Sequence, residues 1–231
     1  MAGDRLLRIL AHLSSGGDTA PGGQRLCQVC ADVAAMSGAG IMLMSGDVPG
    51  GSVCTTNEVS ALIEELQFTL GEGPCVDAFR QDRPVLEPDL ANGGTSRWIA
   101  FAPPAVDAGV RAVFGFPLQV GAVRLGALNL YRDWPGPLSD DQYTDALVLA
   151  GVAARALLGM QAQAQPGALA AELEVGANFR FVVHQASGMV AVQLGVSVGE
   201  ALIRLRAYAF GNDRLLTEVA EEVVGRRLRF C

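Results

Sequence analysis

The segment Gln161–Glu172, QAQAQPGALAAE, constrains the fold of this chain more than any other stretch. Pro166 and Gly167 stop a regular helix there, because proline lacks an amide hydrogen and glycine is a poor helix former. Short apolar runs typical of strands occur before this segment, whereas only helical periodicity follows it. We therefore expect two units, 1–160 and 174–231, joined through residues 161–173.

Two neighbouring apolar runs in the first unit predict the centre of a sheet. Val110–Val120 and Ala122–Arg132 flank Gly121 and are rich in β-branched and aromatic residues, as expected of a hairpin. Gly40–Met44 is a further short strand-like run. Asp140–Ala164 follows with apolar residues at helical spacing and would be roughly 40 Å long. We expect part of this helix, within 140–164, to pair with a second chain in a homodimer.

Three helices are predicted after the joint. Glu174–Leu194 ends at Gly195, which suits the left-handed conformation of a helix cap. Ser197 and Glu200 have the spacing of a capping box for the next helix. Thr217 is expected to cap the third, which is short.

The charge is unevenly distributed between the two units. The chain has a net charge of −7 and no lysine. Residues 1–179 carry 10 Arg against 19 Asp and Glu, whereas residues 180–231 carry 7 Arg against 5 acidic residues. A basic segment after an acidic body indicates either an anionic partner or an ordinary solvated helix surface.

Membrane and export functions are not favoured by the sequence. We see no uninterrupted apolar run of the ~18 to 20 residues that a membrane helix needs. The opening MAGDRLLRIL has no small-residue cleavage site after an apolar stretch. We expect a cytoplasmic protein without membrane association.

The five cysteines do not suggest a disulfide framework, because they are odd in number and scattered. Cys27 and Cys30 have CxxC spacing, but no second pair or histidine cluster completes a metal site. We expect both to be buried small hydrophobic residues, with no metal and no cofactor in the protein.

Catalysis is not expected either. Cys75 lies near a predicted helix start, which can lower a thiol pKa, but His12 and His184 fall in separate units. Cys54 with Cys75 is the one conceivable redox pair for a reductase. We expect Cys75 to be a buried packing residue and the protein not to be an enzyme.

The tail resembles the ANTAR domain, an RNA-binding antitermination module of bacterial regulators. The residues that carry this resemblance span about 175 to 230. In order, they are His184-Gln-Ala-Ser-Gly-Met189, Leu194-Gly-Val-Ser197, Glu200-Ala-Leu202, Leu205-Arg206, Ala209 and Leu216-Thr-Glu-Val-Ala220.

The body resembles a GAF domain, a small-molecule sensory fold. Here the carriers are Gly71-Glu-Gly-Pro-Cys75, Phe116-Pro-Leu118, Leu125-Gly-Ala-Leu-Asn-Leu-Tyr131 and the long closing helix. The order of a GAF domain followed by an ANTAR domain is familiar from actinobacterial regulators.

The two resemblances imply an α+β fold: a six-stranded antiparallel GAF-like sheet with flanking helices, followed by an all-α three-helix ANTAR domain. They also imply a dimeric transcription antitermination regulator that binds paired hexaloop stem-loops in nascent RNA. The GAF part would sense a small molecule or a redox signal. One departure is Ser187, where many family members carry a basic residue.

The expected RNA site combines short, polar and cationic side chains of the tail. Small residues let a helix approach an unpaired base, and amide, hydroxyl and guanidinium groups read its edges and phosphates. The alternative for the small residues is close packing between helices. The expected RNA-binding residues are Gln185, Ala186, Ser187, Gly188, Met189, Arg204, Tyr208 and Arg214, and Arg206, Arg226, Arg227 and Arg229 are weaker candidates for phosphate contacts.

A ligand pocket is expected between the sheet of the GAF-like body and the helices over it. Such pockets are apolar with a few polar groups, although core packing is the alternative for each residue. The expected pocket residues are Met42, Met44, Trp98, Phe101, Phe114, Phe116, Asn129 and Tyr131.

Two other functions fit the tail. Leu216–Ala220 after a glycine turn is typical of the first helix of a DNA-binding helix-turn-helix, but we expect no room for a recognition helix before Cys231. Alternatively, the tail serves only as a dimerising protein-interaction module.

Overall fold

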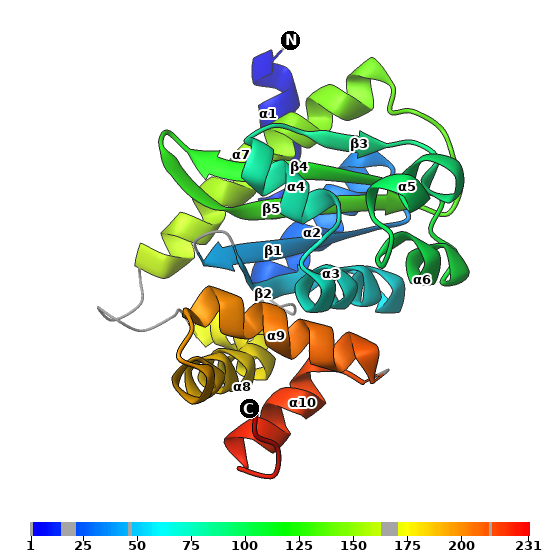
Figure 1. Cartoon of the computed structure of the whole chain (residues 1–231). Coiled ribbons are helices and arrows are strands. Elements are labelled where there is room, and N and C mark those ends of the chain that lie inside the picture. The colour runs from blue at the N-terminus through cyan, green and yellow to red at the C-terminus, as the bar shows by residue number, and fades with distance from the viewer. Residues whose placement is uncertain (1, 15–21, 46–47, 163–170, 213) are drawn as a thin grey trace. The chain divides into compact units, whose positions relative to one another are not determined.

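The computed structural model describes residues 2–14, 22–45, 48–162, 171–212 and 214–231 (Figure 1). The chain forms two compact units, Met1–Val175 and Gly176–Cys231. The predicted joint around Pro166 and Gly167 lies outside the described residues.

The first unit is built on a five-stranded antiparallel sheet in the order β2-β1-β5-β4-β3 (Figure 1). Its strands are β1 (Gly38–Ser45), β2 (Val48–Thr55), β3 (Val85–Glu87), β4 (Ala112–Val120) and β5 (Val123–Arg132). The predicted hairpin is confirmed as β4 and β5, and β5 is the central strand. The described residues form five strands where the resemblance implied six.

One face of the sheet is covered by α1 (Ala2–Ser14), α2 (Gly22–Ala34) and α7 (Asp140–Ala162). In Figure 1, α2 and α7 lie behind the strands. Leu128 of β5 contributes to this core together with Leu149 and Ala153 of α7. Burial of these apolar side chains stabilises the layer. Full burial of one leucine side chain contributes roughly 1.5 to 3 kcal/mol.

The other face is covered by α3 (Glu58–Leu70), α4 (Pro74–Gln81) and the irregular segment after β3. That segment contains η1 (Leu90–Gly94), α5 (Thr95–Arg97) and α6 (Ala102–Asp107). Its core is aromatic: Trp98 and Phe101 pack with Ile63 of α3 and Tyr131 of β5. Tyr131 and Leu130 are adjacent on β5, so they face opposite layers.

α7 is the one uninterrupted helix of the described residues that is long and apolar enough to cross a bilayer. The bent pair Phe181–Leu194 and Val198–Gly211 passes the same test when the two are taken together. In the structure α7 packs on β4, and its buried side chains belong to the core of the sheet.

The second unit contains the predicted three helices: α8, which begins before the unit boundary (Ala171–Leu194), α9 (Val198–Gly211) and α10 (Leu216–Val224). Gly195 has the predicted left-handed conformation, with φ of 67°. The Ser197 hydroxyl accepts a hydrogen bond from the Glu200 amide and caps α9. Apolar side chains of α9 and α10, including Leu205 and Val219, form the core.

Candidate functional sites

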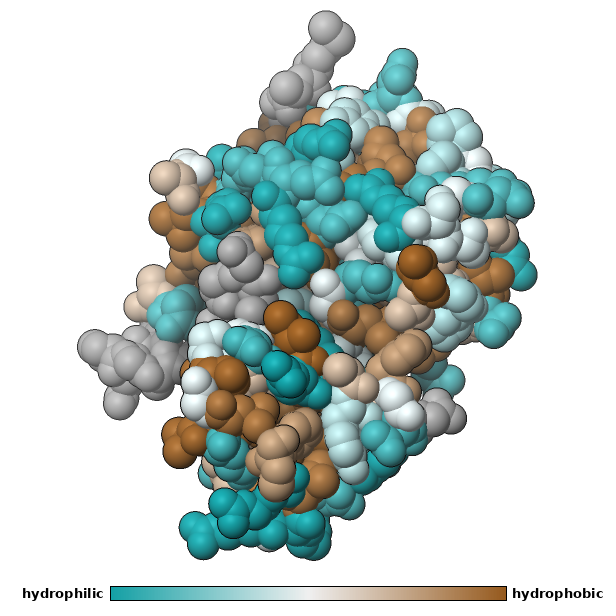
Figure 2. Space-filling model, in the orientation of Figure 1, coloured by the Kyte–Doolittle hydropathy of each residue, from teal (hydrophilic) through white to brown (hydrophobic). Residues whose placement is uncertain are grey.

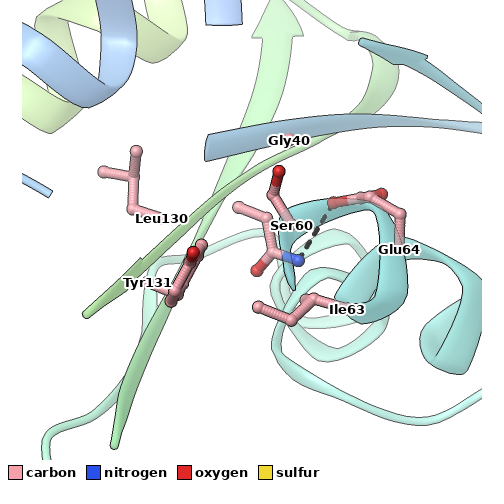
Figure 3. Close-up of a pocket in the computed structure, with 7 residues that line it drawn as sticks. Gly40, Ser60, Ile63, Glu64, Leu130 and Tyr131 are labelled. Carbon is pink, nitrogen blue, oxygen red and sulfur yellow. Dashed lines mark hydrogen bonds between the residues drawn. The ribbon is translucent and has the colours of Figure 1, made fainter. Parts of the chain in front are cut away.

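Three polar side chains of α3 face the sheet: Ser60, Glu64 and Gln67 are all nearly inaccessible to solvent. The Glu64 carboxylate accepts a hydrogen bond of 3.0 Å from the Asn129 amide of β5 (Figure 3). The Gln67 side-chain oxygen accepts one of 2.7 Å from the backbone amide of Cys75. Because buried polar groups need such partners, this cluster fixes α3 against both the sheet and α4.

The packing around Glu64 depends on a glycine. A Cβ at Gly40 of β1 would lie 2.5 Å from a Glu64 carboxylate oxygen. The space lined by these two residues with Ser60, Asn129 and Tyr131 has no room for a water molecule (Figure 3). This space between α3 and the sheet is therefore filled by the protein's own side chains.

Several of the predicted pocket residues do come together on this face. Trp98 and Phe101 pack edge to face with 5.8 Å between ring centroids, and both belong to the same core as Tyr131. Met42 is buried and Met44 is partly buried. Their alternation with Gly40 along β1 places them on the side of Glu64.

Phe114 and Phe116 are a correction to the predicted pocket. They lie on β4 opposite Leu130 and Leu128 of β5, in the core beneath α7. Asn129, which pairs with Gly115 between them, faces the other layer. The two phenylalanines therefore do not line a pocket with Asn129.

A disulfide joins Cys27 of α2 to Cys54 of β2. This corrects the expectation that Cys27 is a simple packing residue and that Cys54 could pair only with Cys75. Helix α2 covers the edge of the sheet at which β2 lies, so residues 27 positions apart meet there. Within the described part of the chain, no three His, Cys, Asp or Glu side chains are placed to hold a metal ion.

The thiols of Cys30 and Cys75 are fully buried, as predicted for both. Burial raises the pKa of Cys30 to about 12. Burial, followed by the negative charge of Glu64, raises the pKa of Cys75 well above its ordinary value. Since the thiolate is the reactive form, both thiols are poor nucleophiles at neutral pH.

In the second unit, the small residues 186–188 of α8 do not all lie on the same face of the helix. Ala186 and Ser187 are fully buried, and the Ser187 hydroxyl donates to the Val183 carbonyl at 2.7 Å. They are therefore removed from the predicted RNA surface, because they share the apolar helix face of Val183 and Val190. A Cβ at Gly188 would meet no atom within 4 Å, so the helix surface at this residue is open.

Four residues at spacings of four, three and four line the exposed face of α8: Phe181, Gln185, Gly188 and Val192. Phe181 is 57% and Val192 85% exposed, so apolar surface flanks the open glycine. Figure 2 shows apolar surface over the helices of this unit.

Met189, one residue on, borders a pocket of about 320 Å³ together with Gln193, Arg226 and Arg229. The sequence indicated Met189 but not Gln193. Arg226 and Arg229 were among the weaker candidates for phosphate contacts in the sequence.

The predicted Arg204 and Arg214 are engaged by carboxylates. Arg204 pairs with Glu200 at 3.2 Å. Arg214 forms two hydrogen bonds of 3.0 Å to Glu222, and this contact raises the pKa of the guanidinium and lowers that of the carboxyl. Their charges are therefore partly neutralised within the unit.

The predicted Tyr208 is half-buried. Its ring lies against that of Phe230, with 5.4 Å between the centroids. Only part of the ring is therefore open to an RNA base.

Comparison with known proteins agrees with the architecture of the first unit. The GAF domain model matches residues 23–157, more than half of the chain. No curated protein matches.

Two similar solved structures are GAF domains of phosphoenolpyruvate-protein phosphotransferases. The Coxiella burnetii domain is 14% identical with a TM-score of 0.54, and the Acinetobacter domain is 15% identical with a TM-score of 0.51. Each match covers 70% of this chain and 95% of the other. The chain belongs to the GAF domain family.

Proposed function

We propose that this protein is a signal-responsive RNA-binding regulator of transcription antitermination. The GAF unit is the sensor, and the C-terminal unit binds paired hexaloop stem-loops in nascent RNA. The ordered ANTAR-like motifs in residues 184–220 support this proposal, as does the three-helix unit in which they lie.

The observation that carries the proposal is the open surface at Gly188. A helix interior normally disfavours glycine by about 1 kcal/mol relative to alanine. No neighbouring group requires a missing Cβ at this position. Close approach of an external, flat group such as an unpaired base explains the glycine. Gln185, exposed one turn earlier, offers an amide for the edge of that base.

A protein-interaction module is the second candidate, because Phe181 and Val192 expose apolar surface on the same face of α8. A DNA-binding helix-turn-helix has less support. After α10 the chain returns to α8, where the Phe230 amide donates to Gln193 at 2.9 Å. The described residues therefore contain no recognition helix after α10.

The Cys27–Cys54 disulfide favours a redox signal over a small molecule. In the cytoplasm, where we expect this protein, disulfides are commonly transient or redox-sensing. A dithiol reductant would supply two electrons and two protons, leaving two thiols and itself becoming a disulfide. Helix α2 contacts α7, the helix that precedes the C-terminal unit. A movement of α2 after the bond at Cys27 is broken would therefore be passed on to α7. A small molecule that entered the space beside Glu64 would have to displace packed side chains.

Two chains are needed to engage two stem-loops at once. We expect a homodimer formed through the solvent side of α7, where Leu147 is 42% exposed. The coupling between sensor and RNA is then the difference in free energy between oxidised and reduced arrangements of the dimer.

A matched pair of glycine substitutions tests the RNA-binding surface. Gly188 and Gly159 are both helical, and neither has an atom within 4 Å of a built Cβ. Gly188→Leu should weaken binding of a two-stem-loop hexaloop RNA by about tenfold or more, equivalent to roughly 1.4 kcal/mol. Gly159→Leu on α7 should leave it unchanged in the same gel shift, provided that size-exclusion chromatography shows the oligomeric state of the wild type. Equal affinities of the two variants would refute the assigned surface.

A further inference from the structure

The segment after α10 builds a pocket against α8. Its volume is about 320 Å³, and it is lined by Met189 and Gln193 of α8 and by Arg226 and Arg229. This volume is at the lower end of small-ligand sites. It suits one nucleotide rather than a nucleic-acid helix.

The segment is held in place at both ends. Arg226 has a left-handed conformation, with φ of 58°, which turns the chain sharply after α10. The amides of Arg227 and Leu228 then donate to the Glu222 carbonyl at 2.7 and 3.1 Å. At the far end the Phe230 amide donates to the Gln193 side-chain oxygen at 2.9 Å. Arg226 and Arg229 therefore reach the pocket from a fixed backbone.

The lining offers hydrogen-bond donors and positive charge. Arg226 and Arg229 are exposed, and neither takes part in an ion pair with a described residue, in contrast to Arg204 and Arg214. The oxygen of the Gln193 amide accepts from the chain, so its NH₂ group is the part that can serve a ligand. Two guanidiniums and an amide donor match the oxygens of a phosphate.

Met189 supplies the apolar part of the lining. A thioether packs favourably on the face or edge of an aromatic ring. Met189 also follows Gly188 directly, so the pocket adjoins the open glycine surface.

We propose that this pocket holds a nucleoside phosphate, with the phosphate bound by Arg226 and Arg229 and the base against Met189. The inference rests on the proposed RNA-binding function when the nucleotide belongs to an RNA strand. A free mononucleotide presents the same chemistry. The C-terminal arginines thus act as a phosphate clamp beside the base-binding surface of α8.

Single substitutions in the full chain test the clamp. Arg226→Gln and Arg229→Gln remove one charge each. Arg227→Gln is the matched control, because the structure leaves this candidate from the sequence exposed and outside the lining of the pocket. Binding of the two-stem-loop RNA should fall about tenfold for each pocket variant, as expected for a lost charged hydrogen bond, and less than about threefold for Arg227→Gln. The slope of log K against log salt concentration should also fall by about 0.7 for a lost phosphate contact on a single strand. Circular dichroism melting confirms that the variants are folded.

Equal losses of RNA affinity in all three variants would overturn the clamp, because nonspecific attraction would explain them. The proposed function would still stand in that case, since the wild type binds the RNA. If the wild-type chain binds no RNA, the proposed function fails and calorimetry with adenosine and guanosine monophosphates decides the pocket. Binding that disappears in Arg229→Gln but not in Arg227→Gln then supports a free-nucleotide site. Absence of both RNA and mononucleotide binding overturns the inference.

Discussion

Cys27 of α2 is bonded to Cys54 of β2, and this bond ties the helix layer of the GAF unit to an edge strand of its sheet. The same helix contacts α7, the last helix before the C-terminal unit. The bond therefore joins an edge strand of the sheet to the helix layer that contains α7.

Loss of this disulfide should destabilise the GAF unit. For a sequence separation of 27 residues, the loop-closure model gives about 3.5 kcal/mol. Cys54→Ser or saturating dithiothreitol should lower the free energy of unfolding of the oxidised protein by about that amount in urea. Dithiothreitol should then have no further effect on Cys54→Ser, and a wild-type unfolding curve indifferent to reductant would contradict the assigned bond.

Alkylation by iodoacetamide at pH 8 should distinguish the five cysteines. Cys30 and Cys75 are buried, and burial raises the pKa of both thiols, so neither supplies thiolate in the folded chain. Cys231 is exposed. Mass spectrometry should find one label on the native oxidised protein, three after unfolding without reductant and five after reduction, in line with three free and two bonded cysteines. A label on native Cys75 would show that the α3–α4 packing opens.

The amide of Asn129 is expected to stabilise the first unit through Glu64. Asn129→Leu removes the 3.0 Å donor to the buried Glu64 carboxylate, and loss of a hydrogen bond to a charged group costs about 1.5 to 3 kcal/mol. Gln119→Leu on the exposed side of β4 is the control, with an expected change within about 0.5 kcal/mol. Chemical denaturation of the two variants would refute the role of the cluster if they unfolded alike.

Substitution by alanine should have opposite effects on the stability of the C-terminal unit at Gly188 and at Gly195. Gly188 is helical with open space at its Cβ position, so Gly188→Ala should stabilise the C-terminal unit by about 1 kcal/mol. Gly195 has a φ of 67°, so Gly195→Ala should destabilise it by about 1 kcal/mol. Urea denaturation followed by circular dichroism checks both signs. Stabilisation by Gly188→Ala together with weaker RNA binding would identify Gly188 as a functional rather than a structural glycine.

Local patterns in the sequence predicted much of this fold. The apolar, aromatic-rich runs around Gly121 predicted the hairpin of β4 and β5, and apolar residues at helical spacing predicted the long α7. Gly195 ends α8 as expected. The faces of the strands were harder to predict. Alternation along each strand predicts which residues of that strand share a face, but not whether Phe114 of β4 and Asn129 of β5 lie on the same face of the sheet. That depends on the pairing of Gly115 with Asn129, which is known only from the folded structure.

Long-range features of the candidate sites could not be predicted in the same way. The Cys27–Cys54 bond requires α2 to lie over an edge strand, and the CxxC spacing of Cys27 and Cys30 gave no sign of it. The arginine pocket depends on a left-handed residue that is not glycine, Arg226, which reverses the chain toward α8. Such a conformation is uncommon outside glycine and has no reliable sequence signal.

The most direct test of the central claim is a comparison of two dissociation constants for the oxidised 231-residue chain at one salt concentration. One ligand is a two-stem-loop hexaloop RNA, and the other is duplex DNA of equal length and charge. We predict at least about tenfold tighter binding of the RNA, because unpaired loop bases can lie against Gly188 whereas stacked bases cannot. Equal constants for the two ligands, or no binding of either, would contradict the proposed RNA-binding function.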